Sequence, residues 1–299
     1  MNFTNLRNKR ILVTGSTGFK GSWLCTWLIS LGANVSGFAL APKSDAPLFD
    51  QLRLRDRIEQ HDADIRDLHA VKKVLNKIKP DIIFHLAAQA LVQKSYNEPY
   101  ITFDTNISGA INLLETVKSL DSLCALVFVT SDKVYRNKEW LWGYRENDEL
   151  GGHDPYSASK AAAELVFDSY QNSFFSEKDG FAAASVRAGN VIGGGDFSAN
   201  RIVPDCIRAF QKNQEVVLRN PLSTRPWQHV LEPLSGYLTL ANKLIEEPHG
   251  SGAWNFGPDP ENVKTVQELT TLAISILGSG FIKINQDESQ PHEANLLML

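Results

Sequence analysis

A glycine-rich turn near the start of the chain constrains the fold more than any other feature of the sequence. An apolar run at residues 10–14 leads into Gly15-Ser-Thr-Gly18-Phe-Lys-Gly21, and apolar residues at helical spacing follow it. Such glycines let backbone amides at a helix N-terminus approach a pyrophosphate, and a second strand at 34–40 completes the expected βαβ unit. The alternative is a turn without a ligand. We expect contacts with a dinucleotide from Gly15, Thr17, Gly18, Phe19, Lys20 and Gly21.

The strand at 34–40 ends without the acidic residue that usually binds the adenosine ribose of NAD. The following residues, Ala41-Pro42-Lys43, also lack the arginine pair that would hold the 2′-phosphate of NADP. Lys43 offers one charge, and a single flexible lysine holds phosphate less well than an arginine fork. We therefore predict NAD as the cofactor, with NADP as the alternative.

Two later segments are predicted to border the same cofactor. Asp64 and Ile65 follow a polar strand end at a place where an adenine is contacted, whereas Asp67 equally suits the cap of a helix. The apolar strand that begins at Asp81 leads to small residues that leave room for a cofactor, and His85 on it is expected to be a core histidine. The predicted contacts here are Leu86, Ala87 and Ala88.

Strands and helices alternate along the first part of the chain, with a helix expected at 104–119 and a strand at 125–130. This order predicts an α/β fold with a doubly wound parallel sheet of the Rossmann type, and a site outside the carboxyl ends of the strands. We expect a dinucleotide-binding domain with the catalytic residues over 1–180. A smaller C-terminal substrate-binding domain is expected over 181–299, partly interleaved with the first.

The stretch from Thr130 to Lys160 gathers side chains that can handle protons. Tyr156 and Lys160 are four residues apart, so on a helix they lie on one face, one turn from each other. We expect the lysine ammonium to lower the pKa of the phenol, so that Tyr156 accepts a proton from a sugar hydroxyl while hydride leaves the carbon. Ser131, at the end of the neighbouring strand, is expected to bond the same hydroxyl.

The motifs TGSTGFKG, HLAAQ, TSDKVY and YSASK resemble those of the extended short-chain dehydrogenase/reductase superfamily. Within it, residues 135–146 and 151–156 are similar to the CDP-glucose 4,6-dehydratases. The resemblance implies an NAD-dependent lyase that converts CDP-D-glucose to CDP-4-keto-6-deoxy-D-glucose and water, for bacterial lipopolysaccharide O-antigen. It also implies that the family's chain continues beyond the position of Leu299.

Dehydration across C5 and C6 requires an acid for the leaving hydroxyl and a base for the C5 proton. The resemblance implies that Asp132 is the acid and that Lys133 occupies the position of the base. A lysine acts as a base only when it is deprotonated. The alternative is that Lys133 pairs electrostatically with Asp132 or Glu146.

The second half of the sequence is expected to bind a nucleotide-diphosphate sugar. Arginine forks suit the phosphates, and Arg225 lies in RPWQHV, which matches a family motif, whereas Arg219 equally suits a structural role. Trp140 and Trp142 either cover the sugar or pack their loop onto the domain. The predicted substrate contacts are Asn190, Arg201, Arg219, Arg225 and, from its resemblance to a segment that borders the nucleotide, His292.

Composition argues against several other classes of protein. A net charge of −4 gives no basic field for nucleic acid, and no apolar run is long enough for a membrane span or a secretory signal. Cys25, Cys124 and Cys206 lack the spacing of a metal site or redox pair, so we expect no metal and a cytoplasmic location. The helices at 104–119 and 156–175 are apolar on more than one face, which predicts a homodimer.

Three alternatives share the predicted fold. A nucleotide-sugar epimerase uses Tyr156 and Lys160 but has no need for Asp132 and Lys133. A dehydratase of dTDP-, GDP- or UDP-sugars shares the reaction and differs in its nucleotide. A non-catalytic NAD(P)-binding regulator would keep the fold without the complete set of catalytic residues.

Overall fold

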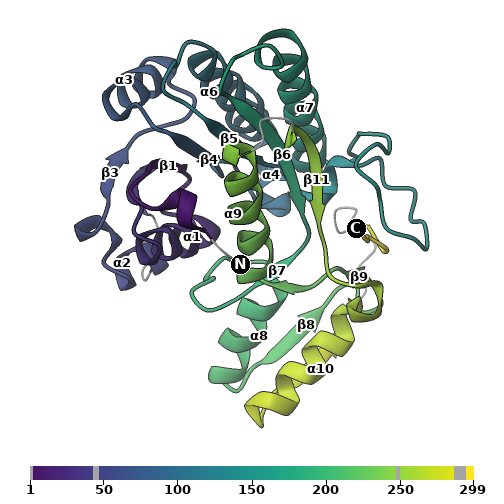
Figure 1. Cartoon of the computed structure of the whole chain (residues 1–299). Coiled ribbons are helices and arrows are strands. Elements are labelled where there is room, and N and C mark those ends of the chain that lie inside the picture. Colours follow the sequence, from purple (N-terminus) through teal and green to yellow (C-terminus); the bar gives the residue numbers. More distant parts are fainter. Residues whose placement is uncertain (1–2, 43–46, 247–249, 286–293) are drawn as a thin grey trace.

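The computed structural model describes residues 3–42, 47–246, 250–285 and 294–299. Its centre is a seven-stranded parallel sheet in the order β11-β6-β5-β4-β1-β2-β3, which confirms the predicted doubly wound fold (Figure 1). The strands are β1 (Arg10–Thr14), β2 (Asn34–Ala39), β3 (Glu59–Asp62), β4 (Ile82–His85), β5 (Ala125–Val129), β6 (Ala182–Ala188) and β11 (Gly252–Phe256).

Helices cover both faces of this sheet because each face is apolar. One face packs against α1 (Phe19–Ser30), α2 (Leu48–Gln51) and α9 (Leu231–Glu246). The other packs against α3 (Leu68–Ile78), α6 (Gly109–Lys118) and α7 (Pro155–Tyr170). The shorter helices α4 (Val92–Asn97) and α5 (Pro99–Phe103) precede α6.

Two predicted helices contain a π-helical segment. The helix expected at 104–119 begins with the π segment Asp104–Ser108, and the helix expected at 156–175 ends with the π segment Gln171–Phe175. Short 3-10 turns lie at Thr4–Leu6, Leu54–Asp56, Asp132–Val134 and Pro260–Asn262. The prediction that Asp67 caps a helix is confirmed, because its side chain accepts hydrogen bonds from the first amides of α3.

A smaller unit lies beside the carboxyl ends of the sheet strands, at the bottom of Figure 1. Its core joins α8 (Ile202–Gln211), α10 (Val266–Leu277) and the parallel pair β8 (Glu215–Leu218) and β13 (Phe281–Ile284). Two further pairs connect it to the sheet: β7 (Val191–Ile192) with β10 (Gln228–His229), and β9 (Thr224–Arg225) with β12 (Lys264–Thr265).

The chain returns to the large sheet after the predicted boundary at residue 180. β6, α9 and β11 all follow that position, and all three belong to the large sheet or its helical layers. The smaller unit is therefore built from α8 and β8, which lie between β6 and α9 in the sequence, and from α10 and β13, which follow β11.

Candidate active site

A single cleft of about 2100 Å³ follows the carboxyl ends of the strands, between the sheet and the smaller unit. Every predicted site residue within the described part of the chain lines this cleft. His292 and Lys43 lie outside the described residues. One cleft thus brings together residues from both halves of the sequence.

The glycine turn is as tight as its sequence predicts. Gly15 has φ +73°, and a Cβ on it would lie 2.9 Å from the backbone of Ala87. A Cβ on Gly21 would lie 2.1 Å from the carbonyl oxygen of Gly15. Gly18 is the N-cap of α1 without a side-chain hydrogen bond to the helix, so the first amides of α1 keep their capacity to bind an anion.

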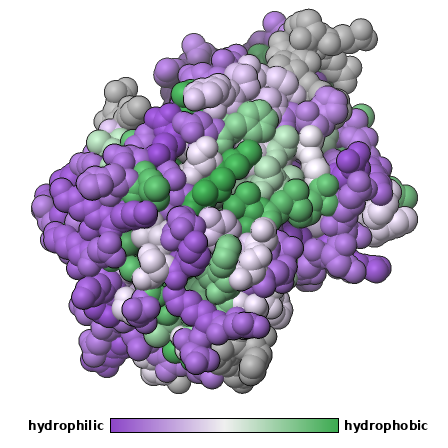
Figure 2. Space-filling model, turned by 90° about the horizontal axis from the view of Figure 1, so that it is seen from above, coloured by the Kyte–Doolittle hydropathy of each residue, from purple (hydrophilic) through white to green (hydrophobic). Residues whose placement is uncertain are grey.

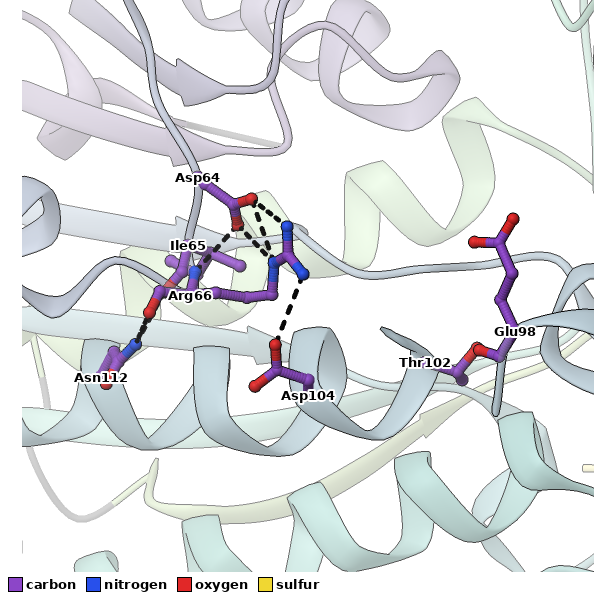
Figure 3. Close-up of polar contacts among 7 residues, drawn as sticks. All are labelled: Asp64, Ile65, Arg66, Glu98, Thr102, Asp104 and Asn112. Carbon is purple, nitrogen blue, oxygen red and sulfur yellow. Dashed lines mark hydrogen bonds and ion pairs between the residues drawn. The ribbon is translucent and has the colours of Figure 1, made fainter. Parts of the chain in front are cut away.

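The predicted adenine end of the cleft is held by a small polar network (Figure 3). Asp64 accepts hydrogen bonds from the Arg66 amide at 3.0 Å and its guanidinium at 2.6 Å, and the same guanidinium approaches Asp104 at 3.4 Å. Asn112 donates to the carbonyl of Ile65 at 3.0 Å. Asp64 and Ile65 are thus fixed at the cleft wall.

Ser131, Asp132 and Lys133 form a tight turn directly after β5. The Ser131 hydroxyl donates to Asp132 Oδ1 at 2.9 Å and accepts from the Lys133 amide at 3.2 Å. Asp132 is only 2% exposed, and its Oδ2 has no hydrogen-bond partner in the part of the chain that the structure describes. A buried carboxyl oxygen aimed into a cleft is a candidate proton donor.

Burial changes the proton affinity of this cluster. It raises the pKa of Asp132, an effect that Lys133 opposes, so the carboxyl is biased toward its protonated form. Lys133 therefore lies within electrostatic reach of Asp132. Glu146, the other proposed partner of Lys133, has its Oε1 hydrogen-bonded to the Asn255 amide at 2.7 Å.

Tyr156 and Lys160 lie on one face of α7, and both are buried. Burial raises the pKa of Tyr156 to about 12, and the groups that oppose this are Ser131 and Arg201. The shift is opposite to the one expected from the neighbouring lysine, because desolvation of the phenolate outweighs the hydrogen bond with Ser131 and the charge of Arg201. Burial also lowers the pKa of Lys160 to about 8, and the Lys160 ammonium donates to the Val129 carbonyl at 3.4 Å.

Tyr237 of α9 is a residue of the site that the sequence did not reveal. Its buried hydroxyl accepts a hydrogen bond from Lys20 at 3.3 Å. Burial, and next the electrostatic effects of Asp132 and Tyr156, raise the pKa of Tyr237. Burial, and next the charge of Arg201, lower the pKa of Lys20 to about 8. A tyrosine on the apolar face of a helix needs a polar partner, but the sequence does not show that the partner is the glycine turn.

On the substrate side, the arginines differ in how they are held. Arg201 pairs with Asp196 at 2.9 Å, and Asp196 was not predicted as a site residue. Arg225 is buried and donates a hydrogen bond to the Thr224 carbonyl at 2.7 Å. Its charge partly opposes the rise that burial causes in the pKa of Asp132. Asn190 and Arg219 are half-buried in the cleft wall.

The two tryptophans of the loop after β5 do not line the cleft. Trp140 packs on Tyr144 with ring centroids 5.7 Å apart, and Trp142 is 57% exposed. Leu297 completes this cluster with 2% exposure. The structure therefore favours loop packing over a cover for the sugar.

His85 is buried and bonds Thr14 Oγ1 at 2.8 Å, which confirms the expected core role. Within the described residues, no group of histidine, cysteine, aspartate or glutamate side chains has the arrangement of a metal site. A search of the same residues for a helix that could cross a membrane found none.

Comparisons with known proteins agree with this geometry. The CDP-glucose 4,6-dehydratase of Salmonella typhimurium is 50% identical over 298 residues, which cover 98% of this chain and 83% of that protein. The CDP-paratose 2-epimerase of Salmonella typhi is 30% identical over 288 residues, with 88% and 83% covered. The structure of Thermus thermophilus UDP-glucose 4-epimerase complexed with NAD has a similar fold, with a TM-score of 0.82 at 24% identity, and the match covers 97% of this chain and 90% of that one.

A model of the GDP-mannose 4,6-dehydratase family matches residues 12–290. The match includes the glycine turn, the Ser131–Lys133 turn, the Tyr156–Lys160 pair and both arginines of the substrate side, Arg201 and Arg225. The chain therefore belongs to the GDP-mannose 4,6-dehydratase family.

Proposed function

We propose that this protein is a lyase that converts CDP-D-glucose to CDP-4-keto-6-deoxy-D-glucose and water. The 50% identical relative supplies the choice of nucleotide sugar. The structural observation that carries the reaction type is Asp132, a buried carboxyl with a raised pKa and one unpartnered oxygen in the cleft. An epimerase does not eliminate water and has no use for such an acid.

The residues at the glycine turn fit NAD. The turn has no room for a Cβ at Gly15 or Gly21, and Gly18 leaves the first amides of α1 uncapped, as a pyrophosphate site requires. Asp64 and Ile65 would border the adenine, and Leu86, Ala87 and Ala88 would leave space for the nicotinamide end. When bound, NAD supplies a hydride acceptor that takes hydride from C4 and returns it to C6.

Ser131, Tyr156 and Lys160 would serve the oxidation. Ser131 and Tyr156 bind the 4-hydroxyl, and Tyr156 takes its proton. Lys160 lies one turn further along α7, where its ammonium would stabilise the phenolate form in which Tyr156 accepts this proton. The nucleotide sugar displaces water from this enclosed pocket, so the charges act on one another at a low dielectric.

Asp132 and Lys133 would serve the elimination. Asp132 gives a proton to the departing 6-hydroxyl, which leaves as water. Lys133 takes the C5 proton in its neutral form, and its backbone is held by the Ser131 hydroxyl. Both residues come from one turn, so acid and base are positioned together relative to the sugar.

The diphosphate would be bound by the arginines of the cleft. Arg225 is the principal candidate because it is buried in the cleft wall and lies in the family motif RPWQHV, and Arg201 is oriented by Asp196. Asn190 and Arg219 supply further polar contacts, and His292 remains a predicted contact.

The test is incubation of the protein and NAD with CDP-, dTDP- and UDP-glucose and with GDP-mannose, followed by the alkaline absorbance of a 4-keto sugar. We expect product from CDP-glucose. Product from another nucleotide sugar alone would change the substrate assignment. A bound dinucleotide without 4-keto product from any of the four would reject the dehydratase and leave the epimerase and the non-catalytic regulator as alternatives.

We also propose that the protein works as a cytoplasmic homodimer, with no nucleic-acid or membrane partner. Apolar side chains lie exposed along α5, α6 and α7, including Tyr100 (77%), Ile111 (38%) and Leu165 (59%). Figure 2 shows an apolar patch on the upper face of the molecule, where α6 and α7 lie. All three cysteines belong to the described residues and are free thiols, as suits a reducing compartment.

A further inference from the structure

An ion pair behind the catalytic turn is unusually well buried and fully bonded. Glu164 and Arg187 meet at 2.9 Å, and their side chains are 3% and 4% exposed. Buried pairs gain little net stability, since their attraction is offset by the loss of hydration. The groups that this pair holds in place therefore matter more than its own contribution to stability.

The carboxylate of Glu164 joins three elements of the site. It accepts a hydrogen bond from Thr130, the residue before Ser131, and another from Ser185 of β6 at 2.9 Å. Glu164 also follows Lys160 by one turn of α7. The carboxylate thus fixes the end of β5, which carries the acid and base, against the helix that carries the tyrosine and lysine.

The guanidinium of Arg187 extends this connection to the loop after the catalytic turn. Its Nη1 donates to the Tyr135 hydroxyl at 2.7 Å and to the Glu146 carbonyl at 2.9 Å. The Tyr135 hydroxyl in turn donates to Asn255 Oδ1 at 2.7 Å. Both ends of the 135–146 segment are therefore tied to the same side chain, and through Asn255 to β11.

We propose that Glu164 and Arg187 are positioning residues that hold the Ser131–Lys133 turn, Lys160 and the 135–146 loop in one catalytic arrangement. This inference rests on the proposed function and extends it to two residues that touch neither substrate nor cofactor. The network accounts for all three nitrogens of Arg187, because Nε and Nη2 bond Glu164. Its geometry couples the residues of oxidation to those of elimination.

The pair also has an electrostatic effect on the site. Glu164 raises the pKa of Lys160 against the larger effect of burial, which lowers it to about 8. The other charged or titratable groups that act on Lys160 or respond to it are His85 on β4 and Lys20 on α1, while Arg187 faces Glu164 from β6. Without the Glu164 charge, the pKa of Lys160 should therefore be lower, and Lys160 should lose its proton at a lower pH.

The experiment compares Glu164→Gln with wild type and with Glu115→Gln, a matched change on α6 in a carboxylate that pairs with Lys118 at the surface. We expect the high-pH limb of the pH profile of kcat to move to lower pH in Glu164→Gln but not in Glu115→Gln. The kcat of Glu164→Gln at pH 8 should be reduced about tenfold. Independently of substrate, the 13Cε resonance of Lys160, assigned with Lys160→Met, should titrate at lower pH in Glu164→Gln.

Two further variants keep the inference testable if Glu164→Gln does not fold. Glu164→Asp retains the charge and should retain the position of the high-pH limb, with an intermediate kcat. Tyr135→Phe removes one acceptor of Arg187 and should raise KM for the nucleotide sugar severalfold without moving the limb. A folded Glu164→Gln with unchanged Lys160 titration and kcat profile would overturn the inference, whereas failure of the wild type to form product would reject only the proposed function.

Discussion

At the scale of single residues, burial sets the chemistry of this site more than pairwise charge does. Asp132, Tyr156 and Lys160 all have pKa values moved toward the neutral form, and for each of them burial is the largest cause. A neutral acid at Asp132 is what the departure of a hydroxyl needs.

Asp132→Asn should lower the dehydration rate by about 10²–10⁴-fold, because an amide cannot give a proton to the leaving hydroxyl. Binding and C4 oxidation should persist, so reduced nicotinamide should accumulate on mixing with CDP-glucose. Asp50→Asn, an exposed change on α2, is the control. A wild-type rate of product formation in Asp132→Asn would contradict the role of the acid.

Lys133→Ala should abolish exchange of the sugar C5 proton with deuterated solvent, because that exchange requires the base of the elimination. Mass spectrometry of recovered nucleotide sugar and product measures it. If the exchange continues at nearly the wild-type rate, another group removes this proton and Lys133 serves only to balance the charge of Asp132.

His85 should make stability depend on pH below neutrality. Burial, and next the charge of Lys160, lower its pKa to about 3, whereas an unfolded histidine titrates near about 6.5. Below pH 6.5 the unfolded chain therefore binds more protons than the folded chain. As the pH is lowered from 6.5 toward 3, the free energy of unfolding decreases by up to about 1.4 kcal/mol per pH unit. His85→Gln should remove this part of the dependence in urea titrations at pH 7.5 and 5.5, while the exposed His69→Gln should not.

At the scale of elements, two helix N-caps allow an effect on stability to be distinguished from an effect on catalysis. α7 begins at an N-cap, Asp154, whose carboxylate accepts from the amide and hydroxyl of Ser157. α10 begins at Thr265, which forms a capping box with Glu268. Both caps hold the first turn of a helix, but only α7 carries Tyr156 in that turn.

Asp154→Ala and Thr265→Ala should each lower the free energy of unfolding by about 1 kcal/mol. Only Asp154→Ala should also lower kcat, since fraying of the first turn of α7 displaces Tyr156. Urea denaturation and steady-state kinetics measure the two effects. Equal activities in the two variants would show that the cap does not position the tyrosine.

The elements that the sequence predicts well are those encoded by local pattern. The run at 10–14, the glycine turn and the Tyr156–Lys160 spacing all depend on neighbours within a few residues, and each is found where expected. The Glu164–Arg187 pair and the Lys20–Tyr237 bond join residues far apart in the sequence. Local periodicity contains no information on such pairs, so they were not predicted.

At the scale of the whole molecule, helices α6 and α7 expose the apolar side chains on which the proposed homodimer rests. Ile111, Leu165, Val166 and Tyr170 surround a shallow hollow between them. Contiguous exposed apolar side chains are often sites of protein–protein contact. The proposed homodimer would bury it.

Leu165→Glu should convert the dimer to a monomer, because a carboxylate in an apolar interface loses its hydration without a partner. Light scattering after gel filtration measures the mass. Leu222→Glu, in a leucine that is 74% exposed outside these helices, should leave the mass unchanged. A monomeric wild type, or a dimer that persists in Leu165→Glu, would place the interface elsewhere or exclude it.

The pairing of β6 with β11 has a consequence for how the chain is made. β6 ends at Ala188 and its partner β11 begins at Gly252, so α8 and β8 leave the ribosome before the sheet can close. Until then β6 is an edge strand with unpaired backbone N–H and C=O groups. Such an edge can pair with the strands of other nascent chains. The large sheet is thus completed only after α8 and β8 of the substrate-binding unit have emerged.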